Sequence, residues 1–227
     1  MAVRGRLIVF EGVEGGGKST QLKRSHDWLR SSDLWRRLQD QGILSDVVVT
    51  REPGGTQLGQ AIRQLLLTPT EGEGMGDRTE LLLYAADRAQ HVDQQLRPLL
   101  ESGVIILCDR FVDSTVAYQG YGRGLDLALI HHLNQIATHG LSSDLTLWLD
   151  LPAELGLSRT QKRGVADRME QNSLGFHQRV QQGFATIAQQ QPDRTVRIEA
   201  SHDPDTVFSH VQSAIESALQ RWYGDLL

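Results

Sequence analysis

A glycine-rich segment near the N-terminus carries the residue types that bind phosphate groups. It runs Gly12-Val-Glu-Gly-Gly-Gly-Lys-Ser19 and matches the pattern G-x-x-x-x-G-K-[ST] at every fixed position. Glycines let successive backbone N–H groups turn toward one anion, and a following helix adds the positive end of its dipole. An incidental glycine-rich turn is the alternative. The apolar run Leu7 to Phe10 before it and the helix-competent Thr20 to Lys23 after it favour a nucleoside-triphosphate loop.

This loop predicts separate tasks for its side chains. Lys18 would supply a mobile charge for the β- and γ-phosphates of the nucleoside triphosphate, and Ser19 a hydroxyl ligand for Mg²⁺. Asp109 follows another apolar run, at a predicted strand end suited to Mg²⁺ or its water shell. Mg²⁺ is therefore the expected cofactor. The predicted ATP-binding residues are Gly12, Val13, Glu14, Gly15, Gly16, Gly17, Lys18, Ser19 and Thr20.

Two arginines, Arg51 and Arg110, also follow directly from predicted strand ends. Two guanidinium forks at such positions could hold an acceptor phosphate bidentately. Phosphoryl transfer needs such charge, because its main obstacle is the repulsion between the donor and acceptor anions. Alternatively, each arginine could pair with its sequence neighbour, Glu52 or Asp109.

Four longer motifs narrow the choice of acceptor. They are Arg51-Glu-Pro-Gly-Gly-Thr56, Tyr84-Ala-Ala-Asp-Arg-Ala-Gln-His91, Asp109-Arg-Phe-Val-Asp-Ser-Thr-Val-Ala-Tyr-Gln119 and the basic stretch Arg159 to Arg168. With the glycine-rich loop they resemble the thymidylate kinase family over nearly the whole chain. The resemblance implies a dTMP kinase that uses ATP and Mg²⁺ to make dTDP, in pyrimidine deoxynucleotide biosynthesis and dTTP supply. A nucleoside monophosphate has a second pKa of about 6, so its oxygen is already nucleophilic and needs no dedicated general base.

The resemblance also assigns an acceptor site. It implies that Tyr84, in place of the usual phenylalanine, stacks on thymine, and that Arg88, one helical turn later, donates to thymine O4. Cytosine would be disfavoured, because its amino group at that place is itself a donor. Thr115 matches a position near the base edge and Tyr118 the tyrosine beneath the sugar C2′; a core role for both tyrosines is the alternative. The implied dTMP-binding residues are Glu14, Arg51, Pro53, Tyr84, Arg88, Arg110, Ser114, Thr115, Tyr118 and Gln119.

The basic stretch predicts a lid over about 156–172. Arg159 and Arg163 form a like-charge i, i+4 pair, which makes more sense beside an anion, although a solvated basic face is the alternative. Gly164 interrupts the helix and could let the lid close over ATP and exclude water. Some family members have an arginine in the phosphate loop, where this chain has Glu14, so the resemblance implies a transition-state arginine from the lid. Glu14 could instead contact the acceptor 3′-hydroxyl or order water at Mg²⁺. The catalytic candidates are Lys18, Arg51, Arg110, Arg159, Arg163 and Arg168.

Elements that would position these residues alternate along the chain as βαβ units. The expected fold class is α/β: a doubly wound five-stranded parallel sheet with helices on both faces, of the P-loop NTPase type, with a small helical lid. Predicted strands are 7–10, 47–50, 104–108, 145–149 and 196–198, and predicted helices are 19–39, 58–67, 79–101, 125–139, 175–190 and 205–219. The stretch 31–37 lengthens the first helix relative to the family, and 68–77 is expected to be a mobile connector.

Composition and net charge limit the number of domains, the partners and the cellular location that can be expected for this chain. With 227 residues, 39% hydrophobic and 22% charged, the chain is expected to form a single domain over 1–227. A net charge of −5 argues against nucleic acid as a partner. The single cysteine, with no long uncharged stretch and no signal peptide, predicts a cytoplasmic protein without a membrane partner. A homodimer is expected from the resemblance alone.

Two other functions fit part of this pattern. A kinase for another monophosphate or for a deoxynucleoside would share the phosphate loop and the lid. A nucleotide-dependent switch would share the loop, but the chain has no Asn-Lys-x-Asp guanine-reading motif, and a switch does not need two extra strand-end arginines.

Overall fold

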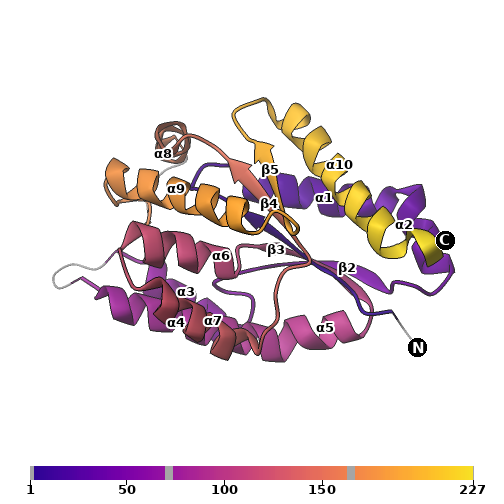
Figure 1. The fold of residues 1–227 in the computed structure, drawn as a ribbon, viewed down its shortest axis with the longest axis horizontal. Helices are drawn as coiled ribbons and strands as arrows, with labels where there is room; N and C mark the ends of the chain where they lie inside the picture. Colours follow the sequence, from indigo (N-terminus) through magenta and orange to yellow (C-terminus); the bar gives the residue numbers. More distant parts are fainter. Residues whose placement is uncertain (1–2, 70–73, 163–166, 227) are drawn as a thin grey trace.

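Five parallel strands form one sheet in the computed structural model of this chain, which describes residues 3–69, 74–162 and 167–226. The strands lie in the order β2-β3-β1-β4-β5 (Figure 1). Their bounds are β1 (Leu7–Glu11), β2 (Asp46–Arg51), β3 (Val104–Asp109), β4 (Leu145–Asp150) and β5 (Thr195–Glu199). Every predicted strand is confirmed, and each extends by one residue at one or both ends.

Helices connect these strands and flank the sheet. Figure 1 shows α1, α2 and α10 on one side of the sheet and α4, α5 and α7 on the other. The α-helices are α1 (Lys18–Ser31), α2 (Asp33–Asp40), α3 (Gln57–Leu67), α4 (Asp77–His91), α5 (Arg97–Glu101), α6 (Val112–Thr115), α7 (Leu127–Thr138), α8 (Ala153–Gln161), α9 (Leu174–Gln190) and α10 (Pro204–Tyr223). The described part also contains the π-helical turns η1 (Val92–Leu96) and η2 (Val116–Gly122) and the 3₁₀ helix η3 (Gly224–Leu226).

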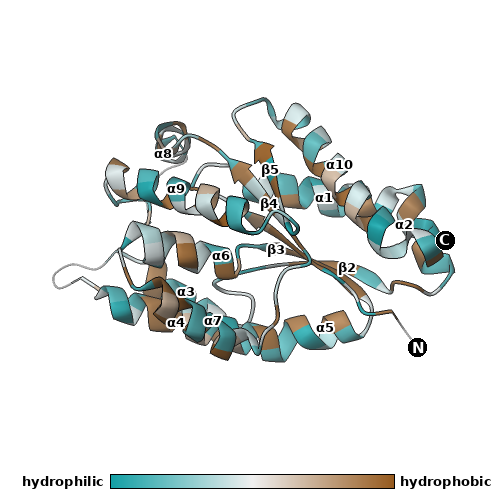
Figure 2. Cartoon of the chain, in the orientation of Figure 1, coloured by the Kyte–Doolittle hydropathy of each residue, from teal (hydrophilic) through white to brown (hydrophobic). Residues whose placement is uncertain are grey.

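The two faces of the sheet are buried in two separate apolar clusters. Ile8 and Phe10 of β1 point into a cluster with side chains of α1, α9 and α10. Leu7 and Val9 of the same strand point the other way, toward η1 and α5. Figure 2 shows brown stretches in the strands, between helices that carry both brown and teal residues. Burial on both faces gives continuous apolar runs in the strands, and it confirms the doubly wound α/β fold.

The helix predicted over 19–39 is wrong as one element, because it is two helices. Ser32 separates α1 from α2 with an extended backbone, and its Oγ accepts a hydrogen bond from Trp35 N at 3.1 Å. Serine favours such an N-cap over a helix interior, because its hydroxyl satisfies a backbone N–H at the start of the next helix. The extra length expected at 31–37 therefore forms the cap and start of a separate helix, which the buried Trp35 and Leu38 hold on the core.

The remaining predicted helices match observed ones, with two differences. The stretch 79–101 is helical throughout but consists of α4, the π-helical turn η1 and α5, whose second residue is Pro98. The short helix α6 and the turn η2 were not expected from the pattern. The connector 68–77 lies partly outside the described residues, which omit 70–73. Among the helices that the structure describes, none is long and apolar enough to cross a membrane.

Candidate active site

A cavity of about 630 Å³ opens at the C-terminal edge of the sheet. The strand register creates it: Phe10 and Arg51 both stand beside Asp109, so the ends of β1, β2 and β3 meet there. The predicted residues that line this cavity are Glu14, Gly15, Gly16, Gly17, Lys18, Ser19, Thr20, Arg51, Pro53, Tyr84, Arg88, Asp109, Arg110, Ser114, Thr115, Tyr118, Gln119 and Arg159. The glycine-rich loop and the motifs predicted to bind an acceptor therefore line one space.

The glycine-rich loop wraps around the start of α1. Lys18 is buried, and its Nζ donates to the carbonyl oxygens of Gly12 at 3.0 Å and Val13 at 2.9 Å. Gly12 and Val13 themselves are not among the residues that line the cavity. Burial lowers the pKa of the Lys18 ammonium. Gly15 faces Gly156 of α8, and a Cβ on Gly15 would lie 2.3 Å from the Gly156 carbonyl oxygen. The helix at the start of the predicted lid thus packs on the phosphate loop through a contact that a side chain would prevent.

The two predicted Mg²⁺ ligands stand together. Ser19 Oγ donates to Asp109 Oδ2 at 3.1 Å, and Asp109 Oδ1 is buried without a hydrogen-bond partner among the described residues. No group of three or more His, Cys, Asp or Glu side chains with metal-site spacing occurs within 3–69, 74–162 and 167–226. Magnesium keeps several waters and takes one or two protein carboxylates along with substrate phosphates. A hydroxyl and one unpaired carboxylate oxygen fit that ion.

Arg110 occupies a strained position at the centre of the site. Its backbone is left-handed (φ 71°), which costs a non-glycine residue roughly 1–3 kcal/mol. Its guanidinium donates to Glu14 Oε1 and, at 3.1 Å, to the Tyr118 hydroxyl, which donates in turn to Glu14 at 3.0 Å. Burial opposes the charge of Glu14, but Arg110 and then Lys18 outweigh it and lower the pKa of this carboxyl to about 2. Arg110 therefore pairs with Glu14, and the pairing with Asp109 that was considered does not form.

Glu11, which the sequence motifs did not single out, holds the loop that carries Arg110. Its buried carboxylate accepts from Phe111 N at 2.8 Å, Ser114 N at 3.1 Å and Ser114 Oγ at 2.5 Å. Burial, and next the nearby Asp113, raise the pKa of Glu11 to about 7. The one signal in the sequence was an acidic residue at the end of an apolar strand run. A carboxylate that is buried at such a place needs hydrogen-bond donors from other parts of the fold.

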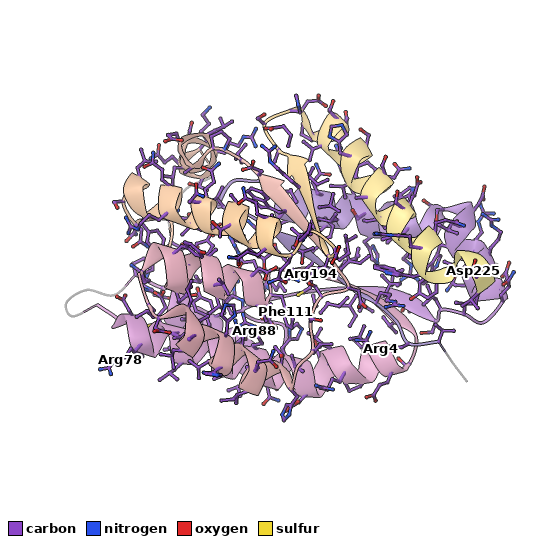
Figure 3. All side chains as sticks on the ribbon, viewed as in Figure 1. Arg4, Arg78, Arg88, Phe111, Arg194 and Asp225 are labelled. Carbon is purple, nitrogen blue, oxygen red and sulfur yellow. The ribbon has the colours of Figure 1, made fainter. Side chains whose placement is uncertain are left out.

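Arg88 is almost fully buried, at 2% exposure, yet its side chain lines the cavity. Its Nε donates to Glu52 Oε2 at 2.8 Å and its Nη1 to Asn134 Oδ1 at 2.8 Å. The other oxygen of Glu52 is 2.9 Å from His91 Nδ1. Glu52 therefore bonds Arg88 and His91, and the pair with Arg51 that was considered as an alternative does not form. Figure 3 shows Arg88 beside Phe111, whose carbonyl oxygen accepts from Arg88 Nη2 at 3.1 Å.

Both tyrosines of the predicted acceptor site line the cavity. Tyr84 is half-buried one helical turn before Arg88, and burial raises the pKa of its phenol. Tyr118 is buried and packs edge-on against Phe176 and Phe184, so it belongs to the core and to the lining at once. The core role and the substrate role considered for Tyr118 are therefore compatible.

The other residues predicted to bind the acceptor are buried or half-buried, and Gln119 is held by a partner far along the chain. Gln119 Nε2 donates to Glu80 Oε1 at 2.7 Å, and the buried Pro53 follows a cis peptide bond with Glu52. Thr115 is buried and Ser114 half-buried, both on the short helix α6. Glu80 is a buried carboxylate that the motifs did not predict, because its partners are distant in sequence.

The three lid arginines have different positions. Arg159 lines the cavity, with Nη1 3.3 Å from Ala200 O and 3.5 Å from Gly15 O. Arg163 and Gly164 lie outside the described residues. Arg168 is not in the lining: its Nε donates to Leu66 O at 2.6 Å, and its Nη2 is 2.6 Å from Glu80 Oε2. The buried Glu80 holds Arg168 beside α4 in this structure, and a role for Arg168 at the phosphates stays a prediction.

Comparisons with known proteins agree on one family. The family model described as thymidylate kinase matches residues 10–211 of the chain. The thymidylate kinase of Cyanothece sp. PCC 7425 is 56% identical, with 97% of each chain covered, and that of Acaryochloris marina is 55% identical, with 96% and 99% covered. The crystal structure of thymidylate kinase from Ehrlichia chaffeensis is similar at a TM-score of 0.71 and 31% identity, with 94% of this chain and 99% of that chain covered.

Proposed function

Because the chain belongs to the thymidylate kinase family, we propose that its cavity transfers the γ-phosphoryl group of ATP to dTMP by charge stabilisation, without a dedicated general base. The products are dTDP and ADP. The observation that supports this site most is the shared lining: the phosphate loop, the strand-end arginines and the pair Tyr84 and Arg88 face one cavity.

In this proposal, catalysis depends mainly on positively charged side chains around the phosphates. The acceptor phosphate is largely a dianion at neutral pH, since its second pKa is about 6. The barrier therefore lies in bringing two anions together, and fixed positive charge lowers it. Lys18 would bind the β- and γ-phosphates, and Arg51 and Arg110 the acceptor phosphate. Arg110 is already held in place by Glu14, so little reorganisation is needed when substrate binds.

Ser19 and Asp109 are the residues that would hold Mg²⁺. The chemistry that this ion supplies when bound is neutralisation of charge on the β- and γ-phosphate oxygens. The unpaired Oδ1 of Asp109 supports this assignment, because a buried carboxylate oxygen is rarely left without a donor or a cation.

Acceptor selectivity would come from the buried side of the cavity. Tyr84 would stack on thymine, and Arg88 would donate to O4 from a position fixed by Glu52 and Asn134. Such donation disfavours cytosine, which leaves two donors facing each other. Tyr118 would lie beneath the sugar and exclude a ribose hydroxyl. The set is completed by Glu14, Pro53, Ser114, Thr115 and Gln119.

The lid would contribute the remaining charge. Arg159 faces the phosphate loop, which makes it one candidate for stabilising the transition state. Arg163 stays a second candidate. Replacing Arg163 with alanine should lower kcat more than it raises KM for dTMP, because a transition-state contact is lost. The opposite pattern would place Arg163 in ground-state binding.

Turnover of four acceptors tests the proposal. With ATP and Mg²⁺, dTDP should appear in step with ADP when dTMP is supplied, and dTMP should be preferred to dUMP, dCMP and ribo-TMP. For dUMP, which lacks one methyl group, we expect a loss of roughly 1–3 kcal/mol in transition-state binding. A preference for dCMP would remove the role of Arg88, and ATP consumption that ignores every acceptor would indicate a nucleotide-dependent switch.

A further inference from the structure

Glu80 on α4 is a fully buried carboxylate to which the proposed function gives no role. Its Oε1 accepts from Gln119 Nε2 at 2.7 Å and from Arg123 Nε at 3.3 Å. Its Oε2 accepts from Arg123 Nη2 at 3.1 Å and is 2.6 Å from Arg168 Nη2. Two guanidinium groups and one amide therefore converge on this carboxylate from segments far along the chain.

The two arginine partners keep Glu80 ionised. Burial raises the pKa of its carboxyl, but hydrogen bonds from Arg123 and Gln119 and the charge of Arg168 outweigh burial and lower the pKa. Arg123 is itself fixed, because its Nη1 donates to Asn172 Oδ1 at 2.8 Å. The side chain of Glu80 is therefore held as a carboxylate, which can only accept hydrogen bonds.

This carboxylate fixes which way the Gln119 amide points. An amide has a nitrogen that donates and an oxygen that accepts, and an ionised carboxylate can bind only the nitrogen. Gln119 Nε2 is thus committed to Glu80. Gln119 also lines the cavity, and its Oε1 has no hydrogen-bond partner among the residues that the structure describes. The atom of this amide that remains for a ligand in the cavity is an acceptor.

The Gln119 amide meets the helix face that carries the proposed base-binding residues. Glu80, Tyr84 and Arg88 lie four residues apart and share one face of α4. Burial, and next the charge of Glu80, raise the pKa of the Tyr84 phenol, so the ring and the carboxylate are close. A base stacked on Tyr84 would therefore have the donors of Arg88 and the acceptor of Gln119 within reach.

The chemistry of the pyrimidine ring matches this pair of contacts. A thymine nucleotide has one ring N–H, at N3, and it lies next to O4, to which Arg88 is proposed to donate. An acceptor beside Arg88 therefore suits N3–H. Cytosine reverses both groups, because its N3 is an acceptor and its amino group is a donor, so it would leave both protein groups unpaired.

We infer that Glu80 is a positioning residue for acceptor selectivity, which turns the Gln119 amide so that its oxygen accepts from N3–H of the base. The inference rests on the proposed function, which supplies a base stacked on Tyr84. The alternative is that Glu80 only neutralises Arg123 and Arg168.

The ratio of kcat/KM for dTMP to kcat/KM for dCMP separates these roles, because a general loss of active protein cancels in a ratio. Glu80→Gln can offer Gln119 either a donor or an acceptor, so the amide is no longer fixed and the ratio should fall about tenfold. Calorimetry should show weaker dTMP binding without weaker dCMP binding. Gln119→Met removes the amide and should lower the ratio similarly, and the double variant should lose little more.

Glu216→Gln is the matched control, because Glu216 Oε1 accepts from Gln212 Nε2 at 3.0 Å on the exposed side of α10, away from the cavity lining. Its ratio should equal that of wild type. An unchanged ratio in Glu80→Gln, or losses that add fully in the double variant, would overturn the inference.

A second substitution decides if Glu80→Gln does not fold. Glu80→Asp keeps the charge opposite the two arginines, but its side chain is one methylene shorter and releases Gln119. The ratio should fall in this variant too, and an unchanged ratio would overturn the inference. A wild-type protein that makes no dTDP would instead defeat the proposed function, so the two failures are distinguishable.

Discussion

The two sides of the cavity are built differently. On the side proposed to bind the donor, a short contiguous segment supplies the loop, and Lys18 is held by two carbonyl oxygens within six residues of it. On the side proposed to bind the acceptor, Arg88 and Arg110 each depend on a partner far along the chain, Glu52 and Glu14 respectively. The contrast suggests that substitutions on the donor side remove activity and spare the fold, whereas substitutions behind the acceptor side affect both.

Glu52→Ala should lower the free energy of unfolding more than any other substitution considered, because Glu52 supports the side proposed to bind the acceptor. It leaves Arg88 and His91 buried without their shared carboxylate, and loss of one partner of a buried ion pair costs about 3–5 kcal/mol. Urea unfolding should therefore show a large drop in the free energy of unfolding. The exposed Glu101→Ala is the control and should change it by less than about 0.5 kcal/mol. A loss below about 1 kcal/mol for Glu52→Ala would show that the buried cluster does not support the fold.

Lys18→Met tests the donor side. We expect kcat for dTDP formation to fall about 10²- to 10³-fold, because one preorganised charge at the phosphates is lost. The free energy of unfolding should change by less than about 1 kcal/mol, since methionine keeps most of the apolar stem. Lys23→Met, on the exposed side of the same helix, should retain near wild-type turnover. Strong destabilisation by Lys18→Met would remove the contrast between the two sides.

Glu11 lies where the two sides meet, directly before the phosphate loop and bonded to the loop after Arg110. Its folded pKa of about 7 exceeds the ordinary value of 4.5, so between these values the unfolded state binds fewer protons. The stability from protonated Glu11 is thus fully present below pH 4.5 and is lost as pH rises through 7. Glu11→Gln mimics the protonated acid and should abolish this dependence, which amounts to about 2–3 kcal/mol between pH 5 and 8.

Unfolding measured at several pH values checks this prediction. Glu14→Gln is the matched control, because the pKa of Glu14 is already about 2 and its contribution stays constant over that range. If the free energy of unfolding depended on pH equally in wild type and Glu11→Gln, the protonation assigned to Glu11 would be contradicted.

Ser32→Ala should have the smallest effect and lies outside both sides of the cavity. Loss of an N-cap costs about 1 kcal/mol. Thermal unfolding should show that loss, with dTMP turnover unchanged. Ser31→Ala is the control, because Ser31 Oγ bonds the Trp28 carbonyl and caps no helix. Equal effects of the two substitutions would mean that the cap does not separate α1 from α2.

Local patterns in the sequence were sufficient to predict the strands, most of the helices and the phosphate loop. Apolar runs and a contiguous motif depend on neighbouring residues, so they can be read without knowledge of the fold. The break at Ser32 was missed because a serine within a helical pattern is ambiguous until its hydroxyl is seen to accept from Trp35 N. The ion pair of Arg168 with Glu80 was not predicted for a similar reason, since it joins residues far apart in the chain.

By itself, the sequence determined the class of chemistry, because the phosphate loop and the two strand-end arginines are contiguous with predictable strands. Tertiary structure alone decided which charges pair within the described part of the protein and which do not. Glu14 pairs with Arg110, Glu52 with Arg88 and Glu80 with Arg123, while Arg51 has no carboxylate partner in the described chain. The physical reason is that charge interactions depend on distance and burial in space, which sequence order does not give.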